Sequence, residues 1–105
     1  MPTTIPQQEA ARATRHAPPW NVILLNDDDH TYPYVVEMLC ALFGHTPQRA
    51  LCLAQEVDAT GRVIVDTTSR ERAELKQEQI QSYGADHRLP ASQGSMSADI
   101  EPCDG

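Results

Sequence analysis

A short apolar segment, Trp20–Leu25, runs directly into an asparagine and three aspartates, Asn26–Asp29. Continuous apolar character over so few residues, with β-branched side chains among them, is typical of a buried strand. A helical pattern begins near Thr31 and Pro33, so the strand has to end at the acidic group. Several like charges therefore gather at the end of a core strand, where they repel one another unless a cation compensates them.

Two helices are predicted after this strand. Over residues 31–43, apolar side chains recur every three to four positions and stop at Gly44, which indicates a helix with a glycine at its C-terminal end. A second start signal follows at once, with Thr46 as the capping residue and Pro47 at the first helical position. The apolar stripe of this second helix continues to about Asp58.

The second half of the chain predicts a strand, a helix, a loop and a last strand, at residues 62–67, 68–83, 84–94 and 95–101. The sequence TSRE, Thr68–Glu71, matches the capping box that opens a helix, and Gly84 is the expected stop. The apolar face of this helix is thin and consists of Ala73, Leu75, Ile80 and Tyr83. The order β-α-α-β-α-β predicts an α+β domain, a three-stranded antiparallel sheet packed against helices.

Length and composition fit one small domain behind a tail. The chain has 105 residues, and residues 1–19 are polar and rich in proline, so we expect a flexible N-terminal extension before a domain at 20–102. No apolar run approaches the roughly 20 residues that cross a bilayer, and no signal peptide is recognisable. We therefore expect a soluble, monomeric protein.

Charge and cysteine content narrow the function classes. The net charge is −7, which disfavours nucleic acid as a partner because that binding depends largely on lysine and arginine. The three cysteines are widely spaced and form no C-x-x-C motif, so they are interpreted as reduced thiols in the cytoplasm. No nucleophile–base arrangement and no phosphate-binding loop occurs, so neither enzymatic activity nor a cofactor is expected.

The acidic group Asn26–His30 has several interpretations. A solvated turn before a helix is the simplest, since Asn and Asp are favoured in both places. A divalent metal site is another, although the glycine and glutamate of a calcium loop are missing. A phosphoacceptor aspartate would need a doubly wound sheet, for which the chain is too short. A socket for an organic ammonium, held by charge-assisted hydrogen bonds, also fits, and composition does not choose among these.

Asp58 adds to the ammonium interpretation. A carboxylate at the C-terminal end of a helix opposes the macrodipole, although an exposed turn residue remains the simpler explanation. Asp58 follows Val57, which continues the apolar stripe. An acid beside an apolar surface suits a ligand that has one charged end and one apolar end.

The segments VILLNDDDHTYPYVVEML and RALCLAQEVDATGRVIV resemble the ClpS adaptor family. The similarity extends through SRERAELKQEQI and covers residues 20–83, with a weaker match at 95–101. The resemblance implies a non-catalytic adaptor that holds the N-terminal residue of a degradation substrate, recognised by its free α-ammonium and its large hydrophobic side chain. Such an adaptor passes the substrate to an AAA+ unfoldase of the ClpA or ClpC type, which works with ClpP.

The resemblance also implies roles for individual residues. Asn26 and Asp27 would accept hydrogen bonds from the α-ammonium, together with Asp58, which stands where the family usually has a histidine. The side-chain pocket would be lined by Asp28, His30, Tyr32, Val35, Ala54, Val57 and Met96. Glu71 and Lys76 fall where the family docks on the N-terminal domain of the unfoldase, and the segment before Pro18 matches a mobile extension used in delivery.

Three departures from the family alter these expectations. Asp58 can still accept from an ammonium, but a third anion makes the empty socket harder to keep ionised. Tyr32 stands where many members have a methionine that gates the pocket, and Ala54 where one often lines it, so the preferred first residue is expected to differ. The C-terminal segment GSMSADIEP lacks the His-Pro-Leu pattern that is common in the family. Two alternatives remain: a regulatory module that docks on the unfoldase without binding N-terminal residues, and a metal-binding protein that uses Asp27–His30.

Overall fold

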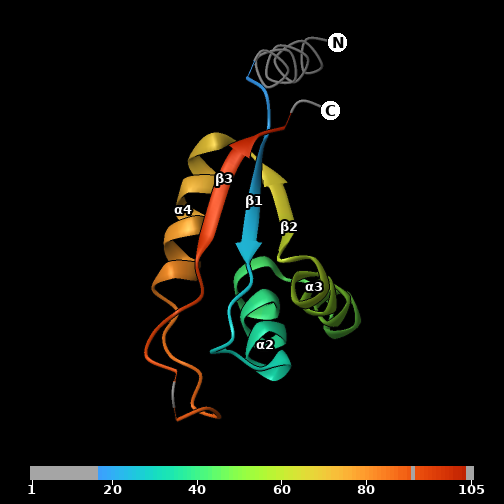
Figure 1. Cartoon of the computed structure of the whole chain (residues 1–105). Coiled ribbons are helices and arrows are strands. Elements are labelled where there is room, and N and C mark those ends of the chain that lie inside the picture. The colour runs from blue at the N-terminus through green and yellow to red at the C-terminus, as the bar shows by residue number, and fades with distance from the viewer. Residues whose placement is uncertain (1–16, 91, 104–105) are drawn as a thin grey trace, which may run out of the picture.

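The computed structural model describes residues 17–90 and 92–103. The predicted flexible extension lies outside them, apart from residues 17–19. The described elements are β1 (Trp20–Leu25), α2 (Tyr32–Phe43), α3 (Pro47–Thr60), β2 (Arg62–Thr68), α4 (Arg70–Gln81) and β3 (Ala98–Pro102) (Figure 1). The three strands form one antiparallel sheet with the order β2-β1-β3, so the predicted α+β fold is confirmed.

The central strand β1 is apolar except for Asn21, and both of its faces are covered. Val22 and Leu24 face the helices and are fully buried in the main hydrophobic cluster. Ile23 faces the opposite side, where it is only 1% exposed. On that side Arg62 of β2 and Glu101 of β3 form an ion pair at 3.2 Å, and the strand register places this pair diagonally across β1 at the level of Ile23.

The starts of α2 and α3 and the end of α2 follow the predicted signals, whereas α3 runs to Thr60, two residues past the predicted end near Asp58. Thr31 and Thr46 are the N-caps, and each side-chain hydroxyl accepts a hydrogen bond from a backbone N–H in the first turn, at 3.3 and 3.2 Å. Both helices end at a glycine in the left-handed region, Gly44 with φ 71° and Gly61 with φ 91°. The bounds of these two helices are therefore set by local chemistry.

The boundaries of α4 and β3 correct the prediction. The N-cap of α4 is Ser69, whose hydroxyl accepts from the N–H of Arg72 at 3.3 Å, and Thr68 instead stays in the β2 ladder opposite Trp20. The helix ends at Gln81, with Ser82 as its C-cap, and does not extend to Tyr83. The last strand also begins later than predicted, at Ala98.

The cap at Ser69 can be tested directly. Ser69→Ala should lower the free energy of unfolding by about 1 kcal/mol, because one N–H of the first turn loses its acceptor. Urea denaturation followed by circular dichroism measures this change. Ser69→Asp is the matched control, because its carboxylate keeps the acceptor and complements the helix dipole, so its stability should equal that of the native chain. A loss of stability in the Asp variant as large as in the Ala variant would contradict the assignment.

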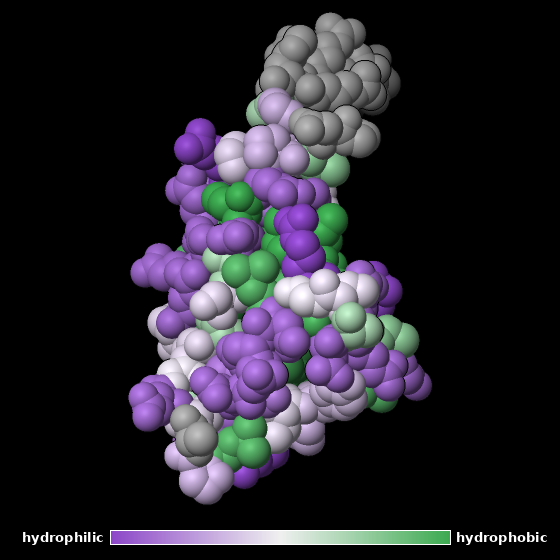
Figure 2. All heavy atoms as spheres, viewed as in Figure 1, coloured by the Kyte–Doolittle hydropathy of each residue, from purple (hydrophilic) through white to green (hydrophobic). Residues whose placement is uncertain are grey.

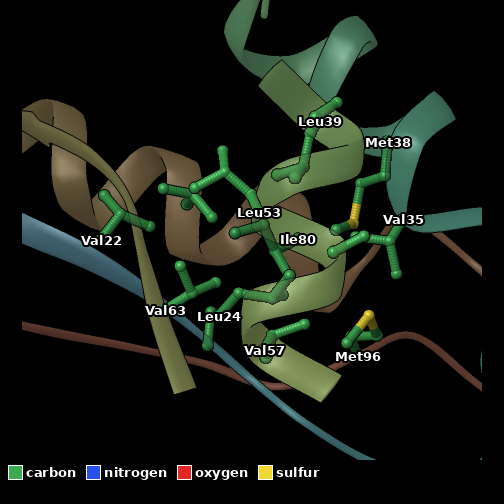
Figure 3. Close-up of a cluster of buried hydrophobic side chains, with 14 of the residues drawn as sticks. Val22, Leu24, Val35, Met38, Leu39, Leu53, Val57, Val63, Ile80 and Met96 are labelled. Atoms are coloured by element: carbon green, nitrogen blue, oxygen red, sulfur yellow. The ribbon is translucent and has the colours of Figure 1, made fainter. Parts of the chain in front are cut away.

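The hydrophobic core lies between the sheet and the three helices (Figure 3). Ala73 and Ile80 of α4 are completely buried in it, whereas Leu75 and Tyr83, predicted for the same helix face, are 47% and 38% exposed. The face of the molecule seen in Figure 2 is mainly hydrophilic, and hydrophobic residues show between the hydrophilic ones. None of the helices in the described part of the chain is long and apolar enough to span a membrane.

Candidate functional site

The end of β1 is held on both sides by backbone hydrogen bonds. The N–H of Leu25 donates to the carbonyl of Ser97 at 3.0 Å, and the N–H of Asn26 donates to the carbonyl of Gly61, also at 3.0 Å. Gly61 caps α3 and Ser97 directly precedes β3. The exposed side chain of Asn26 thus lies where the end of α3 and the segment before β3 meet the strand.

Asp27 has one occupied and one available carboxylate oxygen. Its Oδ1 accepts from the N–H of Asp29 at 3.0 Å and lies 2.6 Å from Nδ1 of His30. No donor from residues 17–90 or 92–103 contacts Oδ2, and the side chain is 32% exposed. Since a carboxylate offers about four acceptor positions, Asp27 keeps capacity for a donor that comes from outside the chain.

His30 connects the acidic turn to the segment that leads to β3. Its side chain is only 2% exposed, and its Nε2 lies 2.7 Å from the carbonyl oxygen of Gly94, while Nδ1 contacts Asp27. The ring also lies against that of Tyr34, with centroids 4.5 Å apart. The imidazole therefore fixes the position of Asp27 relative to the segment that carries Met96.

Tyr32 and Asp58 form a hydrogen bond that joins two helices. The phenol of Tyr32, the first residue of α2, donates to Oδ2 of Asp58, in the last turns of α3, at 2.6 Å. This bond to an anion raises the pKa of the Tyr32 phenol, because losing the proton would leave two negative charges together. Tyr32 remains 41% exposed, so the bond lies at the surface.

Four of the residues predicted to line a side-chain pocket come together in the structure. Val35 of α2, Ala54 and Val57 of α3 and Met96 belong to one hydrophobic cluster, and none is more than 4% exposed. In Figure 3, Val35, Val57 and Met96 approach one another from three different segments. The remaining predicted lining residue of the acidic turn, Asp28, is exposed.

A buried carboxylate that sequence reasoning missed anchors the start of α2. Asp86 is 1% exposed and its Oδ2 accepts from both the N–H and the hydroxyl of Thr31, at 2.7 and 2.8 Å. Its Oδ1 accepts from the N–H of Arg88 at 3.0 Å. Burial by itself raises the pKa of Asp86, but these hydrogen bonds outweigh it and lower the pKa to about 2.

The two residues predicted to dock on a partner lie on α4, apart from the acidic turn. Glu71 is exposed in the first turn of α4, close to Arg70, whose guanidinium lies 5.0 Å from the ring of Trp20. Trp20 begins β1, so Glu71 lies near the opposite end of this strand from Asn26. Lys76 is partly buried, and its ammonium donates to the carbonyl of Leu42 at 2.5 Å.

The metal interpretation gains no support from the geometry of the turn. Within the described ranges, 17–90 and 92–103, no group of three or more His, Cys, Asp or Glu side chains is placed to hold a metal ion. His30 instead uses its two ring nitrogens on Asp27 and Gly94. Two of the proposed metal ligands, Asp27 and His30, are therefore engaged with each other and with the backbone.

Comparison with known proteins identifies the family. Residues 15–92 match the family described as ATP-dependent Clp protease adaptor protein ClpS. The chain belongs to the ClpS family. A ClpS protein of Thermosynechococcus vestitus is 35% identical over 85 residues, which cover 80% of this chain and 90% of that protein. A ClpS protein of Mycobacterium marinum is 31% identical over 83 residues, covering 79% and 82%.

A solved ClpS structure has the same fold. ClpS2 of Agrobacterium tumefaciens, bound to L-phenylalaninamide, superimposes with a TM-score of 0.71 over 83% of this chain and 99% of its own, at 23% sequence identity. The resemblance to the ClpS adaptors inferred from sequence is thus confirmed for the family and the fold. This chain is accordingly an adaptor of the ATP-dependent Clp protease.

Proposed function

We propose that this chain binds N-terminal degradation signals, consisting of a free α-ammonium and a large hydrophobic first side chain, and delivers them to an AAA+ unfoldase of the ClpA or ClpC type that works with ClpP. The observation that carries the proposal is the partly exposed Asp27, held by His30 with its second oxygen available, next to Asn26 at the end of β1. A third acceptor, Asp58, lies three residues before Gly61, whose carbonyl holds the backbone of Asn26.

The apolar part of the signal would pack against an apolar cluster near these acceptors. Val35, Val57 and Met96 form an apolar cluster between α2, α3 and the segment before β3. A charge-assisted hydrogen bond contributes about 1.5–3 kcal/mol, and burying a large apolar side chain contributes a similar amount. Neither alone exceeds the entropy lost on association, so both parts are required, and the complex should be reversible enough for a carrier.

The relative with a known ligand supports the proposal. Agrobacterium tumefaciens ClpS2 is bound to L-phenylalaninamide, a compound with a free amine and an aromatic side chain. In this chain, the free amine of a ligand is expected to bind Asn26 and Asp27, and its hydrophobic side chain is expected to bind the apolar cluster.

Delivery requires a second surface that is separate from the ligand site. We assign it to Glu71 and Lys76 on α4, the helix whose first turn lies at the far end of β1 from Asn26. Acting with a Clp protease, the chain would work in the cytoplasm as a monomer, and its cysteines Cys40, Cys52 and Cys103 are free thiols in the structure.

The experiment that tests the proposal compares peptides with free and acetylated N-termini. Acetylation removes the α-ammonium charge but leaves the first side chain unchanged. Peptides beginning with Leu or Phe should bind when the amine is free, and acetylation should abolish binding as measured by isothermal titration calorimetry. Equal affinity for the free and acetylated forms would refute the ammonium socket.

A second candidate is a regulatory module that docks on the unfoldase without binding N-terminal residues. The hydrogen bond between Tyr32 and Asp58 and the burial of the four apolar pocket residues favour it, because together they describe a closed site in the free protein. Co-purification with the unfoldase combined with no response to any free-amine peptide would select this function. Peptide binding would reject it.

A further inference from the structure

The bond between Tyr32 and Asp58 joins helix faces that also carry two residues of the apolar cluster. Tyr32 precedes Val35 by three positions in α2, and Ala54 precedes Asp58 by four in α3, spacings that place each pair on one helix face. The 2.6 Å contact between Tyr32 and Asp58 therefore connects a point beside Val35 to a point beside Ala54. It spans the space between the two helices at the surface of the cluster.

Tyr32 differs from the apolar residues predicted to line the pocket in being exposed. Val35, Ala54, Val57 and Met96 are held in the core, with exposed fractions of 4% or less, whereas Tyr32 is 41% exposed. A first side chain of a ligand that enters between α2 and α3 therefore meets the Tyr32 ring before it meets the fixed walls. A wide side chain has to displace that ring further than a slender one.

We propose that Tyr32 and Asp58 act together as a specificity-determining pair. Their hydrogen bond holds α2 and α3 together beside the apolar cluster. It favours a ligand whose first residue is leucine, which is slender, over one whose first residue is tryptophan, which has a wide indole. The inference rests on the proposed function and deepens it. Admitting a wide side chain breaks the phenol–carboxylate bond, whereas a slender one leaves the bond intact.

The two residues have separable roles in this arrangement. Asp58 accepts from the phenol through Oδ2 only, so Oδ1 remains available for the ammonium of the ligand. Removing the phenol oxygen of Tyr32 therefore changes the relative affinity for ligands with different first side chains. Removing the charge of Asp58 weakens every free-amine ligand to the same degree.

The test measures dissociation constants of two free-amine peptides that differ only in their first residue, Leu or Trp. Tyr32→Phe keeps the ring but loses the hydroxyl, and it should reduce the ratio of the Trp to the Leu constant by about three- to tenfold. Asp58→Asn keeps an oxygen that accepts from the phenol, so the ratio should stay at the native value while both affinities fall together. Tyr83→Phe is the matched control, since Tyr83 is 38% exposed and should leave both constants unchanged.

The possible results distinguish a failure of the specificity pair from a failure of the proposed function. If the native chain binds both peptides and Tyr32→Phe leaves their ratio unchanged, the specificity pair is refuted and the proposed function stands. If only Tyr32→Phe binds, the pair closes the site completely, and binding of degradation signals by the native chain is refuted. If neither the native chain nor Tyr32→Phe binds any free-amine peptide, both proposals are refuted. Thermal unfolding of each variant shows that it is folded.

Discussion

Asp27→Asn should weaken binding of a free-amine, leucine-starting peptide by about ten- to a hundredfold. The asparagine keeps an oxygen that can accept from Nδ1 of His30 and from the N–H of Asp29, so the turn is retained. The negative charge proposed to face the α-ammonium is lost, and a hydrogen bond assisted by that charge contributes about 1.5–3 kcal/mol, which corresponds to this range. Isothermal titration calorimetry with the native chain and the variant measures the difference.

The control for this variant is Asp29→Asn, which removes the same charge two positions away. Only the backbone N–H of Asp29 contacts Asp27, and its side chain is exposed. This variant should change the affinity less than about threefold, and the change should disappear at high salt because exposed charges are screened. Equal losses in both variants would mean that the overall negative field attracts the peptide and that Asp27 makes no specific contact.

The parts of the fold that the sequence predicted are those set by local chemistry. Thr31 and Thr46 cap their helices, and Gly44 ends the first of them, because each residue satisfies backbone groups within a few positions of itself. The predicted start of α4 at Thr68 was wrong because Thr68 and Ser69 are both capable of capping a helix. The β-branched Thr68 pairs with Trp20 in the sheet, and Ser69 caps the helix. Local signals identify a cap but do not choose between adjacent candidates.

Contacts between distant residues were beyond sequence reasoning. Asp86 lies in the segment GADHRLP, which predicts a loop, and nothing local indicates that it contacts Thr31, which is 55 positions earlier. The approach of Tyr32 to Asp58 likewise depends on how α2 packs against α3. In the sequence, Tyr32 and Asp58 stand out separately because each differs from the usual family residue. Only the packing of the helices shows that they form a hydrogen bond with each other.

Replacing Asp86 is expected to have the largest effect on stability. Asp86→Ala should lower the free energy of unfolding by about 3 kcal/mol, because it leaves two partly buried donors of Thr31 without an acceptor and empties a buried position. For a domain of this size, that corresponds to a melting temperature lower by about 15 °C. Thermal unfolding followed by circular dichroism measures the shift.

Arg88→Ala is the control for the ion pair. The Arg88 side chain is 40% exposed and bonds to Asp86 at 3.4 Å and to the exposed Glu37, so its loss should cost less than about 1 kcal/mol. A loss in Arg88→Ala as large as in Asp86→Ala would mean that the ion pair, and not the bonds to Thr31, anchors the start of α2.

The contribution of Asp86 should also depend on pH in a direction fixed by its pKa. Hydrogen bonding lowers the pKa in the folded chain from 3.8 to about 2, so the unfolded chain binds a proton at higher pH than the folded chain does. The stabilisation is therefore complete above about pH 5 and is lost as the pH falls toward 2. Asp86→Asn has no carboxylate to titrate, so the difference in unfolding free energy between it and the native chain should shrink over this interval. A difference that stays constant from pH 6 to about pH 2 would show that the ionised carboxylate is not what holds Thr31 in place.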